Sequence, residues 1–399
     1  MSYRIPLSQP SITALESDIV TEAVQSGWVS SKGEYIDRFE EFFAQYCGTR
    51  YALSTSSGTT ALHLTLASYG IQAGDEVIVP DITFIATANA VAYTGAKPIF
   101  VDIDSETLCI DVERVKAAIT ARTKAIIAVH LYGHPANVPA LRAIADPRGI
   151  VVIEDAAEAH GASIRSEKTG SLGHCGIFSF YGNKIVTCGE GGMITTNDEM
   201  LYRQARFLRS QAMSPTQRYW HTAVGFNYRM TNLQAALGFA QMQRISDFIQ
   251  KKQTIFSQYQ YHLATLQPRV ILNRVTPETQ NVYWQICMEV SDWKARTRDQ
   301  FMQQLAENGI ESRPYFYPMS DMPMYISDEW RTPVAHQVSE RGLNLPSYFD
   351  MRSQDVEEVC KVVRRCLAWC DAHQEKQPAL PRQTPRALNR LATKLRTTL

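Results

Sequence analysis

The first part of the chain alternates short apolar runs with segments of helical spacing. The apolar runs are unbroken, which is typical of strands buried on both faces of a parallel sheet. We expect strands at Tyr51–Leu53, Glu76–Val79, Pro98–Val101, Ala125–Val129, Ile150–Ile153 and Met193–Thr196. The segments between them predict helices at Thr59–Tyr69, Ile85–Tyr93, Asp111–Ala121 and Val138–Ala145. This alternation predicts an α/β domain with a mostly parallel sheet and right-handed βαβ connections.

The pattern changes after about Asn227. Apolar residues with helical spacing predict one long helix over Asn232–Tyr261. A smaller α+β region follows, with a strand expected at Tyr283–Val290 and helices at Arg298–Asn308 and Asp355–His373. We therefore predict a large domain over residues 1–250, a small C-terminal domain over 251–375 and a tail over 376–399. The tail is basic, has several prolines and no acidic residue, and is predicted to be disordered.

Composition narrows the class of partner. The 399 residues suit a large domain with a smaller one, and 40 basic residues balance 40 acidic ones. No net field attracts nucleic acid or an acidic membrane, so a small molecule is the expected partner. The N-terminus lacks an apolar signal core and no apolar run is long enough for a membrane span, so we expect a cytoplasmic protein. The eight cysteines show no metal-binding spacing and are expected to be reduced, buried thiols, with no metal site.

A small-residue turn, Ser56 to Thr60, lies between the first predicted strand and its helix. The N-terminus of a helix presents free backbone N–H groups and the positive end of the helix dipole, which together suit a phosphate group. Serine and threonine also cap ordinary helices, so this turn alone leaves both interpretations open.

An acidic residue, Asp155, follows a predicted buried strand directly. The carboxyl edge of an open α/β sheet is where ligands bind. The alternative is that Asp155 caps a following helix, on which Glu158 would share its face.

A lysine with small neighbours, Lys184, precedes a glycine-rich turn at 189–192. Small neighbours let the backbone approach a ligand closely. Spacing alone favours an ordinary surface lysine in a hairpin, since a lysine that bonds covalently to a carbonyl needs an aldehyde cofactor nearby. Pyridoxal phosphate requires a phosphate cradle, a lysine and an acid at its pyridine nitrogen, and the three segments together supply all three.

At these residues the sequence resembles the DegT/DnrJ/EryC1/StrS family of sugar aminotransferases, which has the aspartate-aminotransferase fold. The resemblance runs from about Ile5 to about Cys370. The motifs that carry it are SGTTALHL (57–64), PDITFIATANAV (80–91), HLYGHP (130–135), IEDAAEAHGA (153–162), FSFYGNK (178–184), GEGGM (189–193), GFNYRMTNLQAA (225–236) and RPYFYPM (313–319).

The resemblance implies pyridoxal phosphate as cofactor, with Lys184 as the catalytic residue that bonds to it. Asp155 would pair with the pyridinium nitrogen, Glu158 would contact the phenolic oxygen, and Phe84 would stack on the ring. The residues implied at the phosphate are Gly58, Thr59, Ser179 and, from the other subunit of a homodimer, Asn227. For the substrate the candidates are Trp28, Arg229 and Arg313. An arginine could bind phosphate or carboxylate, and Arg313 could instead form a surface salt bridge. The tryptophan could line the sugar site or only pack.

The implied reaction transfers an amino group from glutamate to the keto carbon of a nucleotide-linked 4-keto-6-deoxy sugar. The motifs favour GDP-4-keto-6-deoxymannose as acceptor and a role in O-antigen and lipopolysaccharide biosynthesis. The alternatives are a dTDP- or UDP-linked keto sugar, or a regulatory protein that keeps the fold without activity, since fold does not fix function. Some members of the family have histidine in place of this lysine and act as dehydratases, so the lysine at position 184 favours amino transfer.

Overall fold

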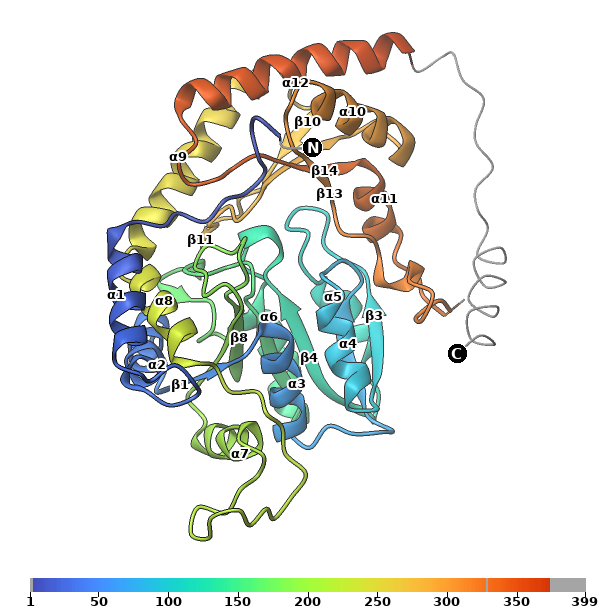
Figure 1. Cartoon of the computed structure of the whole chain (residues 1–399). Coiled ribbons are helices and arrows are strands. Elements are labelled where there is room, and N and C mark those ends of the chain that lie inside the picture. The colour runs from blue at the N-terminus through green and yellow to red at the C-terminus, as the bar shows by residue number, and fades with distance from the viewer. Residues whose placement is uncertain (1–2, 328, 374–399) are drawn as a thin grey trace, which may run out of the picture.

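A seven-stranded sheet forms the centre of the protein (Figure 1). The computed structural model describes residues 3–327 and 329–373. The strand order is β1-β9-β8-β5-β4-β2-β3. Strand β9 is antiparallel to β1 and β8, and the other neighbouring pairs are parallel. The strands are β1 (Tyr51–Thr55), β2 (Glu76–Pro80), β3 (Lys97–Val101), β4 (Thr123–Val129), β5 (Val151–Asp155), β8 (Cys175–Ser179) and β9 (Gly192–Thr196).

The predicted mostly parallel sheet is confirmed, and its predicted strands agree with the structure to within two residues at either end. Every residue of β2 is buried, as an unbroken apolar run between covered faces requires. One boundary matters for function. Strand β5 extends to Asp155, so this acid is the last residue of the strand and not the residue after it.

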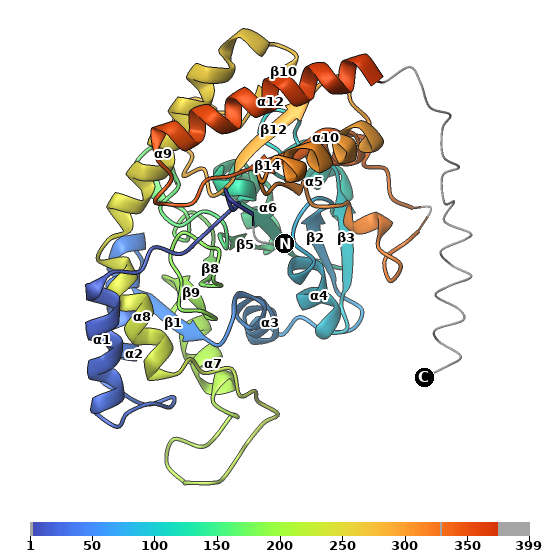
Figure 2. The same ribbon diagram turned by 45° about the horizontal axis from the view of Figure 1, so that its top comes forward.

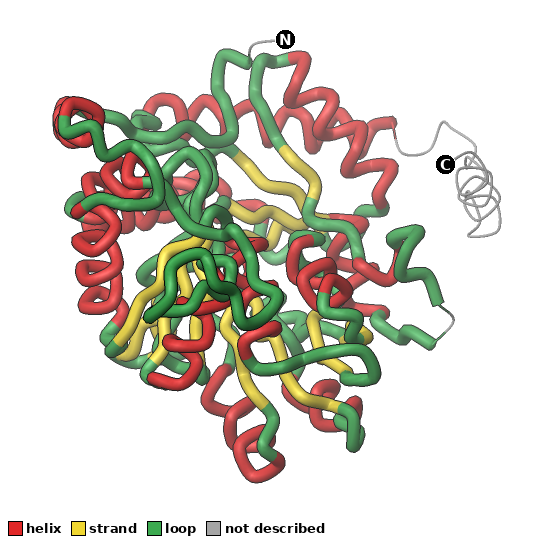
Figure 3. The backbone as a smooth tube through the Cα atoms, turned by 60° about the horizontal axis from the view of Figure 1, so that its bottom comes forward, coloured by secondary structure: helices red, strands yellow, loops and turns green. Residues whose placement is uncertain are grey.

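Helices enclose the sheet, as the tube drawing in Figure 3 shows. Helix α4 joins β2 to β3 and α6 joins β4 to β5, which are the βαβ connections expected from the sequence. The helices of this part are α1 (Ala14–Gln25), α2 (Glu34–Cys47), α3 (Gly58–Ser68), α4 (Ala86–Tyr93), α5 (Val112–Ala118), α6 (Val138–Ala145), α7 (Glu199–Arg209) and α8 (Asn232–Met242), with short 3-10 turns η1 (Leu131–Gly133) and η2 (Asp146–Arg148).

A second, four-stranded antiparallel sheet has the order β10-β12-β14-β13. A small three-stranded sheet, β11-β6-β7, ties the link before β12 to the large domain. The strands are β6 (Ser163–Ile164), β7 (Glu167–Lys168), β10 (Val270–Leu272), β11 (Thr279–Gln280), β12 (Ile286–Val290), β13 (Arg313–Pro314) and β14 (Gly342–Leu345). The helices are α9 (Ile245–Leu263), α10 (Ala295–Glu307), α11 (Pro333–Arg341) and α12 (Ser353–His373), with 3-10 turns η3 (Ala264–Leu266) and η4 (Met319–Asp321).

Two predictions about elements were wrong. The single helix expected over Asn232–Tyr261 is two helices, α8 and α9. The break is at Arg244, whose backbone leaves the helical region (φ −109°, ψ 7°) while its guanidinium pairs with the buried Glu16 at 2.6 Å. The strand expected from Tyr283 begins at Ile286, because Tyr283 has the left-handed dihedral φ 49°, which no strand accommodates.

Two groups of buried apolar side chains form the interior. Helix α9 belongs to both, since Phe248 packs in the first group and Phe256 in the second. Figure 2 shows this helix, in yellow, running from beside α8 toward α12. The predicted domain boundary near residue 250 falls inside α9 and stays a prediction, and the predicted tail over 376–399 lies outside the described residues.

The eight cysteines are buried and free, as expected. Within residues 3–327 and 329–373, no helix has the length and apolar content needed to cross a membrane. The cytoplasmic location stays a prediction.

Candidate active site

A cavity of about 480 Å³ lies at the carboxyl edge of the parallel strands. Val129, Asp155 and Ser179, the last residues of β4, β5 and β8, all line it. Parallel strands end at the same edge of a sheet, so three segments far apart in the chain deliver their final side chains to one place. This edge is where open α/β sheets bind ligands.

Lys184 reaches this cavity from the turn after β8, where its N–H donates to the carbonyl of Tyr181 at 2.9 Å. Its side chain is only 11% exposed, so the interpretation as a surface lysine was wrong. The Nζ atom lies 3.6 Å from Oε1 of Glu158 and 4.0 Å from the ring centroid of Trp284. Burial lowers the pKa of Lys184, and the carboxylates of Glu158 and Asp155 oppose this effect. A lysine with a lowered pKa supplies more neutral, nucleophilic amine at neutral pH.

Asp155 is buried at the floor of the cavity. The hydroxyl of Thr87 donates to its Oδ2 at 2.8 Å, and the N–H of Ala157 donates to its Oδ1 at 3.3 Å. The helix that Asp155 was proposed to cap does not exist, because residues 156–160 form turns. Burial raises the pKa of Asp155, and the Thr87 hydrogen bond is the first of the contacts that oppose this rise. A buried carboxylate of this kind requires a cationic partner.

Glu158 lies beside the lysine. Its Oε2 accepts the backbone N–H of Tyr132 at 2.9 Å, and burial raises its pKa to about 7. The nearby Lys184 amine is the largest of the contacts that oppose this rise. Glu158 therefore exchanges its proton near neutral pH, next to an amine that must do the same.

We expect Glu158→Gln to remove a pH dependence of stability in the cofactor-free protein. The folded pKa lies above the unfolded one, so the carboxyl contributes stability at low pH and loses it as pH rises through about 7. The unfolding free energy of the variant, relative to wild type, should therefore rise by about 3 kcal/mol between about pH 4 and about pH 8. Urea unfolding at a series of pH values measures this, and a constant difference across the series would contradict it.

The start of helix α3 forms a cradle for an anion. Its first N–H groups have no partner within the helix, and the Ser57 side chain accepts from the N–H of Thr60. A Cβ atom at Gly58 would lie 2.8 Å from Cβ of Ser179, so a larger residue at this position would collide with that side chain. Gly58, Thr59 and Ser179 all line the cavity. This is the geometry with which helix N-termini bind phosphate.

Aromatic side chains form one wall of the cavity. Phe84 is 56% exposed, and its ring centroid lies 6.1 Å from that of Phe316. Phe316 in turn stacks on Tyr132 at 5.4 Å with an interplanar angle of 14°. Phe84 lines the cavity with much of its ring exposed, and its stacking on a flat ring stays a prediction.

These features fit pyridoxal phosphate by its chemistry. The anion cradle at Gly58 suits the phosphate, the buried carboxylate of Asp155 suits a protonated ring nitrogen, and the Lys184 amine suits the aldehyde. Asn183, the residue before the lysine, has a buried Oδ1 atom with no hydrogen-bond partner among the described residues, so the cavity retains an unused acceptor. The individual residue roles stay proposals.

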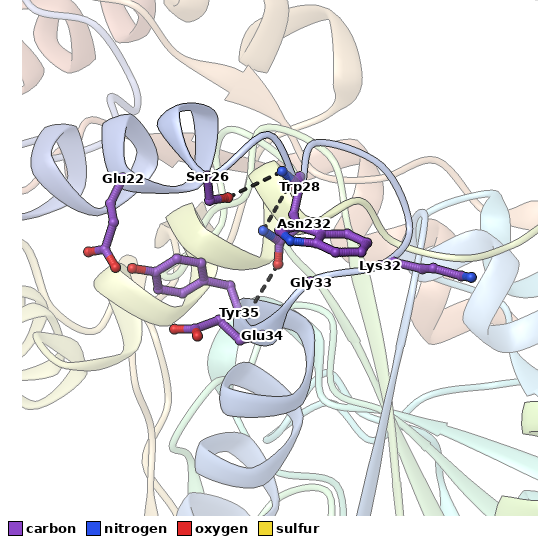
Figure 4. Close-up of a pocket in the computed structure, with 8 residues that line it drawn as sticks. All are labelled: Glu22, Ser26, Trp28, Lys32, Gly33, Glu34, Tyr35 and Asn232. Carbon is purple, nitrogen blue, oxygen red and sulfur yellow. Dashed lines mark hydrogen bonds between the residues drawn. The ribbon is translucent and has the colours of Figure 1, made fainter.

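The residue expected at the phosphate from the other subunit, Asn227, and the three substrate candidates do not all lie in the cavity. Arg313 lines the same cavity. Asn227 is exposed and, with Arg229, is absent from the cavity lining. Trp28 lies in a second pocket with Lys32 and Tyr35, where Asn232 donates to its carbonyl at 2.8 Å (Figure 4). Within one chain, the structure therefore does not bring Asn227, Arg229 or Trp28 to Lys184.

Several lining residues had no role in the sequence analysis. Thr87, Tyr132 and Phe316 are within the quoted motifs PDITFIATANAV, HLYGHP and RPYFYPM, and this was the only sequence signal for them. Further lining residues include Trp284, Gln285 and Asn344. No local pattern indicates these three, because they reach the cavity from the link before β12 and from β14.

Comparison with known proteins agrees with this geometry. The chain matches the model of the DegT/DnrJ/EryC1/StrS aminotransferase family over residues 10–364. It is 44% identical over 367 residues to GDP-perosamine synthase from Caulobacter vibrioides, covering 91% of this chain and 98% of that protein. It is 42% identical over 363 residues to GDP-perosamine synthase from Escherichia coli O157:H7, covering 91% of this chain and 98% of that protein.

Solved structures agree with the fold. The structure is similar to the putative sugar aminotransferase Spr1654 from Streptococcus pneumoniae in its PMP form, with a TM-score of 0.89, 25% identity and coverage of 94% of this chain and 100% of that one. It is also similar to DesV from S. venezuelae in complex with a ketimine intermediate, with a TM-score of 0.83, 33% identity and coverage of 90% and 95%.

Proposed function

This chain belongs to the DegT/DnrJ/EryC1/StrS aminotransferase family, and from that membership we propose that it transfers an amino group, with pyridoxal phosphate as cofactor, to a GDP-linked keto sugar. The proposed acceptor is GDP-4-keto-6-deoxymannose, the product is GDP-perosamine and the donor is glutamate. The observation that carries the acceptor is the 40–44% identity, over nearly the whole chain, to GDP-perosamine synthases from three organisms.

Lys184 performs two tasks in this reaction. When bound, pyridoxal phosphate supplies an aldehyde for covalent attachment of amines and a ring that accepts electrons. The neutral amine of Lys184 would hold the cofactor covalently through that aldehyde until the amino group of glutamate displaces it. The freed amine would act as general base and then general acid on the proton of the substrate carbon in both half-reactions, and it would hold the cofactor again once the amino sugar leaves.

Other residues would hold the cofactor in place. Asp155 would keep the ring nitrogen protonated, and Thr87 orients that carboxylate through its 2.8 Å hydrogen bond. Gly58, Thr59 and Ser179 would bind the phosphate. Glu158 would contact the phenolic oxygen, and Phe84 would cover one face of the ring.

Arg313 is proposed to bind an anionic group of a substrate, because its guanidinium lies in the cavity wall and stays 54% exposed beside Glu311. Arg229 and Trp28 are proposed for the substrate of the other subunit, since neither lines the cavity of its own chain.

We also propose a homodimer with shared active sites. The loop between α7 and α8 projects from the body of the chain (Figure 1). It carries exposed apolar side chains that a monomer has no reason to present to water: Met213, Tyr219, Trp220 and Val224. Asn227 lies in the same loop and is itself exposed. A second copy of the chain that covers the loop would receive Asn227 at its phosphate cradle.

The acceptor is tested with a panel of nucleotide-linked 4-keto-6-deoxy sugars. We expect kcat/KM for the GDP-linked sugar to exceed that for dTDP- and UDP-linked sugars by at least about tenfold, the discrimination that a few differing contacts provide. Product mass and glutamate consumption measure amination, with Lys184→Ala as the blank.

A higher kcat/KM for a dTDP- or UDP-linked sugar would overturn the acceptor and leave the aminotransferase assignment standing. No amination of any sugar in the panel, by protein that holds the cofactor, would contradict the activity itself.

A further inference from the structure

The indole of Trp284 lies against the amine of Lys184, although it comes from the link before β12. The distance from Nζ to the ring centroid is 4.0 Å, well inside the range of a cation–π contact. Trp284 is 6% exposed and lines the cavity. A lysine side chain that is free of the cofactor therefore has an aromatic face within reach.

Hydrogen bonds and an unusual dihedral angle fix the backbone around Trp284 and so place its ring. The N–H of Val282 donates to the carbonyl of Gly133 at 3.1 Å, and the N–H of Tyr283 donates to Oδ1 of Asn281 at 2.7 Å. Tyr283 has φ 49°, a left-handed conformation that bulky residues rarely adopt and that neighbouring contacts must hold. A Cβ atom at Gly133 would lie 2.9 Å from the backbone nitrogen of Trp284, so the close packing of these two segments requires glycine at position 133.

Two hydrogen bonds hold the tryptophan at both ends. Its indole Nε1–H donates at 2.8 Å to the carbonyl of Asn183, the residue directly before Lys184. Its own carbonyl accepts from Nζ of Lys252 at 3.1 Å, a fully buried amine that has no carboxylate partner among the described residues. The indole ring is thus hydrogen-bonded to the backbone directly before Lys184, although about 100 residues separate the two along the chain.

Few other charged groups face the Lys184 amine. Glu158 is 3.6 Å away and Asp155 acts at longer range. His160 is buried against Phe178, and burial lowers its pKa to about 3, so it is neutral. Glu158 has a pKa of about 7 and loses its charge as the pH falls through neutrality. The face of the indole ring is the one partner in this set whose attraction for a cation does not depend on pH.

We propose that Trp284 is a positioning residue for Lys184, whose ammonium group it receives on its indole face whenever the amine is not bonded to the cofactor. This inference rests on the proposed function, in which the amine of Lys184 is free from the entry of glutamate until the amino sugar leaves. An amine held on a fixed ring keeps one position in the cavity. The side chain then has less rotamer freedom to lose at the proton transfer.

The test follows capture of pyridoxal phosphate by cofactor-free protein as a function of pH. Attachment requires the neutral amine, so the midpoint of the capture rate reports the protonation of Lys184. Borohydride fixes the attached group, and peptide mass locates it at residue 184. The ionisable groups of the cofactor titrate in the same way with every variant, so they do not contribute to the difference between the midpoints of two variants.

Trp284→Phe and Trp284→Leu both remove the indole N–H, and only the first keeps an aromatic face. We expect the leucine variant to lower the midpoint by about one pH unit, a tenfold change in the protonation equilibrium, and the phenylalanine variant by about a third of that. Trp293→Leu, at a buried tryptophan packed on Phe301 in the second core, controls for lost packing and should leave the midpoint unchanged.

Equal midpoints for the phenylalanine and leucine variants, or a shift as large in Trp293→Leu, would overturn the role of Trp284 alone. Failure of the wild-type protein to capture the cofactor at Lys184 would overturn the proposed function as well. Trp284→Met replaces the leucine variant in the same comparison if the latter does not fold.

Discussion

Lys184→Ala is expected to lower kcat by at least about 10⁴-fold, the upper end of what a positioned proton carrier contributes, because covalent attachment is lost as well. The variant should fold and still bind pyridoxal phosphate without a covalent bond, since Asp155 and the helix start at Gly58 remain. Lys184→Arg should fail nearly as badly, because a guanidinium stays protonated and is no nucleophile. Turnover, visible absorbance and the mass of borohydride-treated protein measure these effects together.

Lys251→Ala is the matched control, since Lys251 has an exposed side chain that pairs with Asp350 at the surface. It should retain wild-type turnover and the borohydride-fixed label at residue 184. A Lys184→Ala protein that keeps a borohydride-reducible bond to the cofactor and turns over near the wild-type rate would remove Lys184 from its assigned role.

Mixing two inactive variants, Asn227→Asp and Lys184→Ala, is expected to restore activity once the subunits exchange. In the proposed dimer each site takes Lys184 from one chain and Asn227 from the other. A mixed dimer therefore holds one site with both defects and one with neither. Random exchange at equal amounts should give about a quarter of wild-type activity, since half of the dimers are mixed and half of their sites are intact.

Lys184→Ala mixed with Asp155→Asn provides the control. Both residues line the cavity of the same chain, so every site of that mixed dimer carries one defect and no activity should return. Recovery that is equal in both mixtures, or absent from the first despite demonstrated exchange, would count against a site shared between subunits.

The pattern along the chain predicted six of the seven strands of the large sheet and missed β8, which carries Ser179 to the cavity. Buried parallel strands must be continuously apolar, so β2, β4 and β5 are visible as runs of such residues. The end of a strand is also visible, and the position of Asp155 follows from it. Lys184, Gly58 and Ser179 were found through motifs whose spacing is local to one turn each.

The local spacing of apolar residues did not predict where one long helix is interrupted or where the strand β12 begins. The helix expected over Asn232–Tyr261 has apolar residues on one side throughout, and it ends near Arg244 because that side chain pairs with Glu16 of α1. The strand expected from Tyr283 begins later because a left-handed residue turns the next side chain toward Lys184. In both cases a contact with a distant segment outweighs the local preference.

The sequence by itself thus indicated most elements of the large domain and singled out Lys184, Asp155 and the helix start at Gly58 as candidates for the cofactor site. Only the tertiary structure decided that Thr87 orients Asp155, that Glu158 and Trp284 share the amine of Lys184, and that Asn227 lies outside the cavity of its own chain. The physical reason is the separation along the chain of the residues that interact. Burial and helix geometry are properties of a few consecutive residues, whereas these contacts join segments that only the packed fold brings within hydrogen-bond or van der Waals distance.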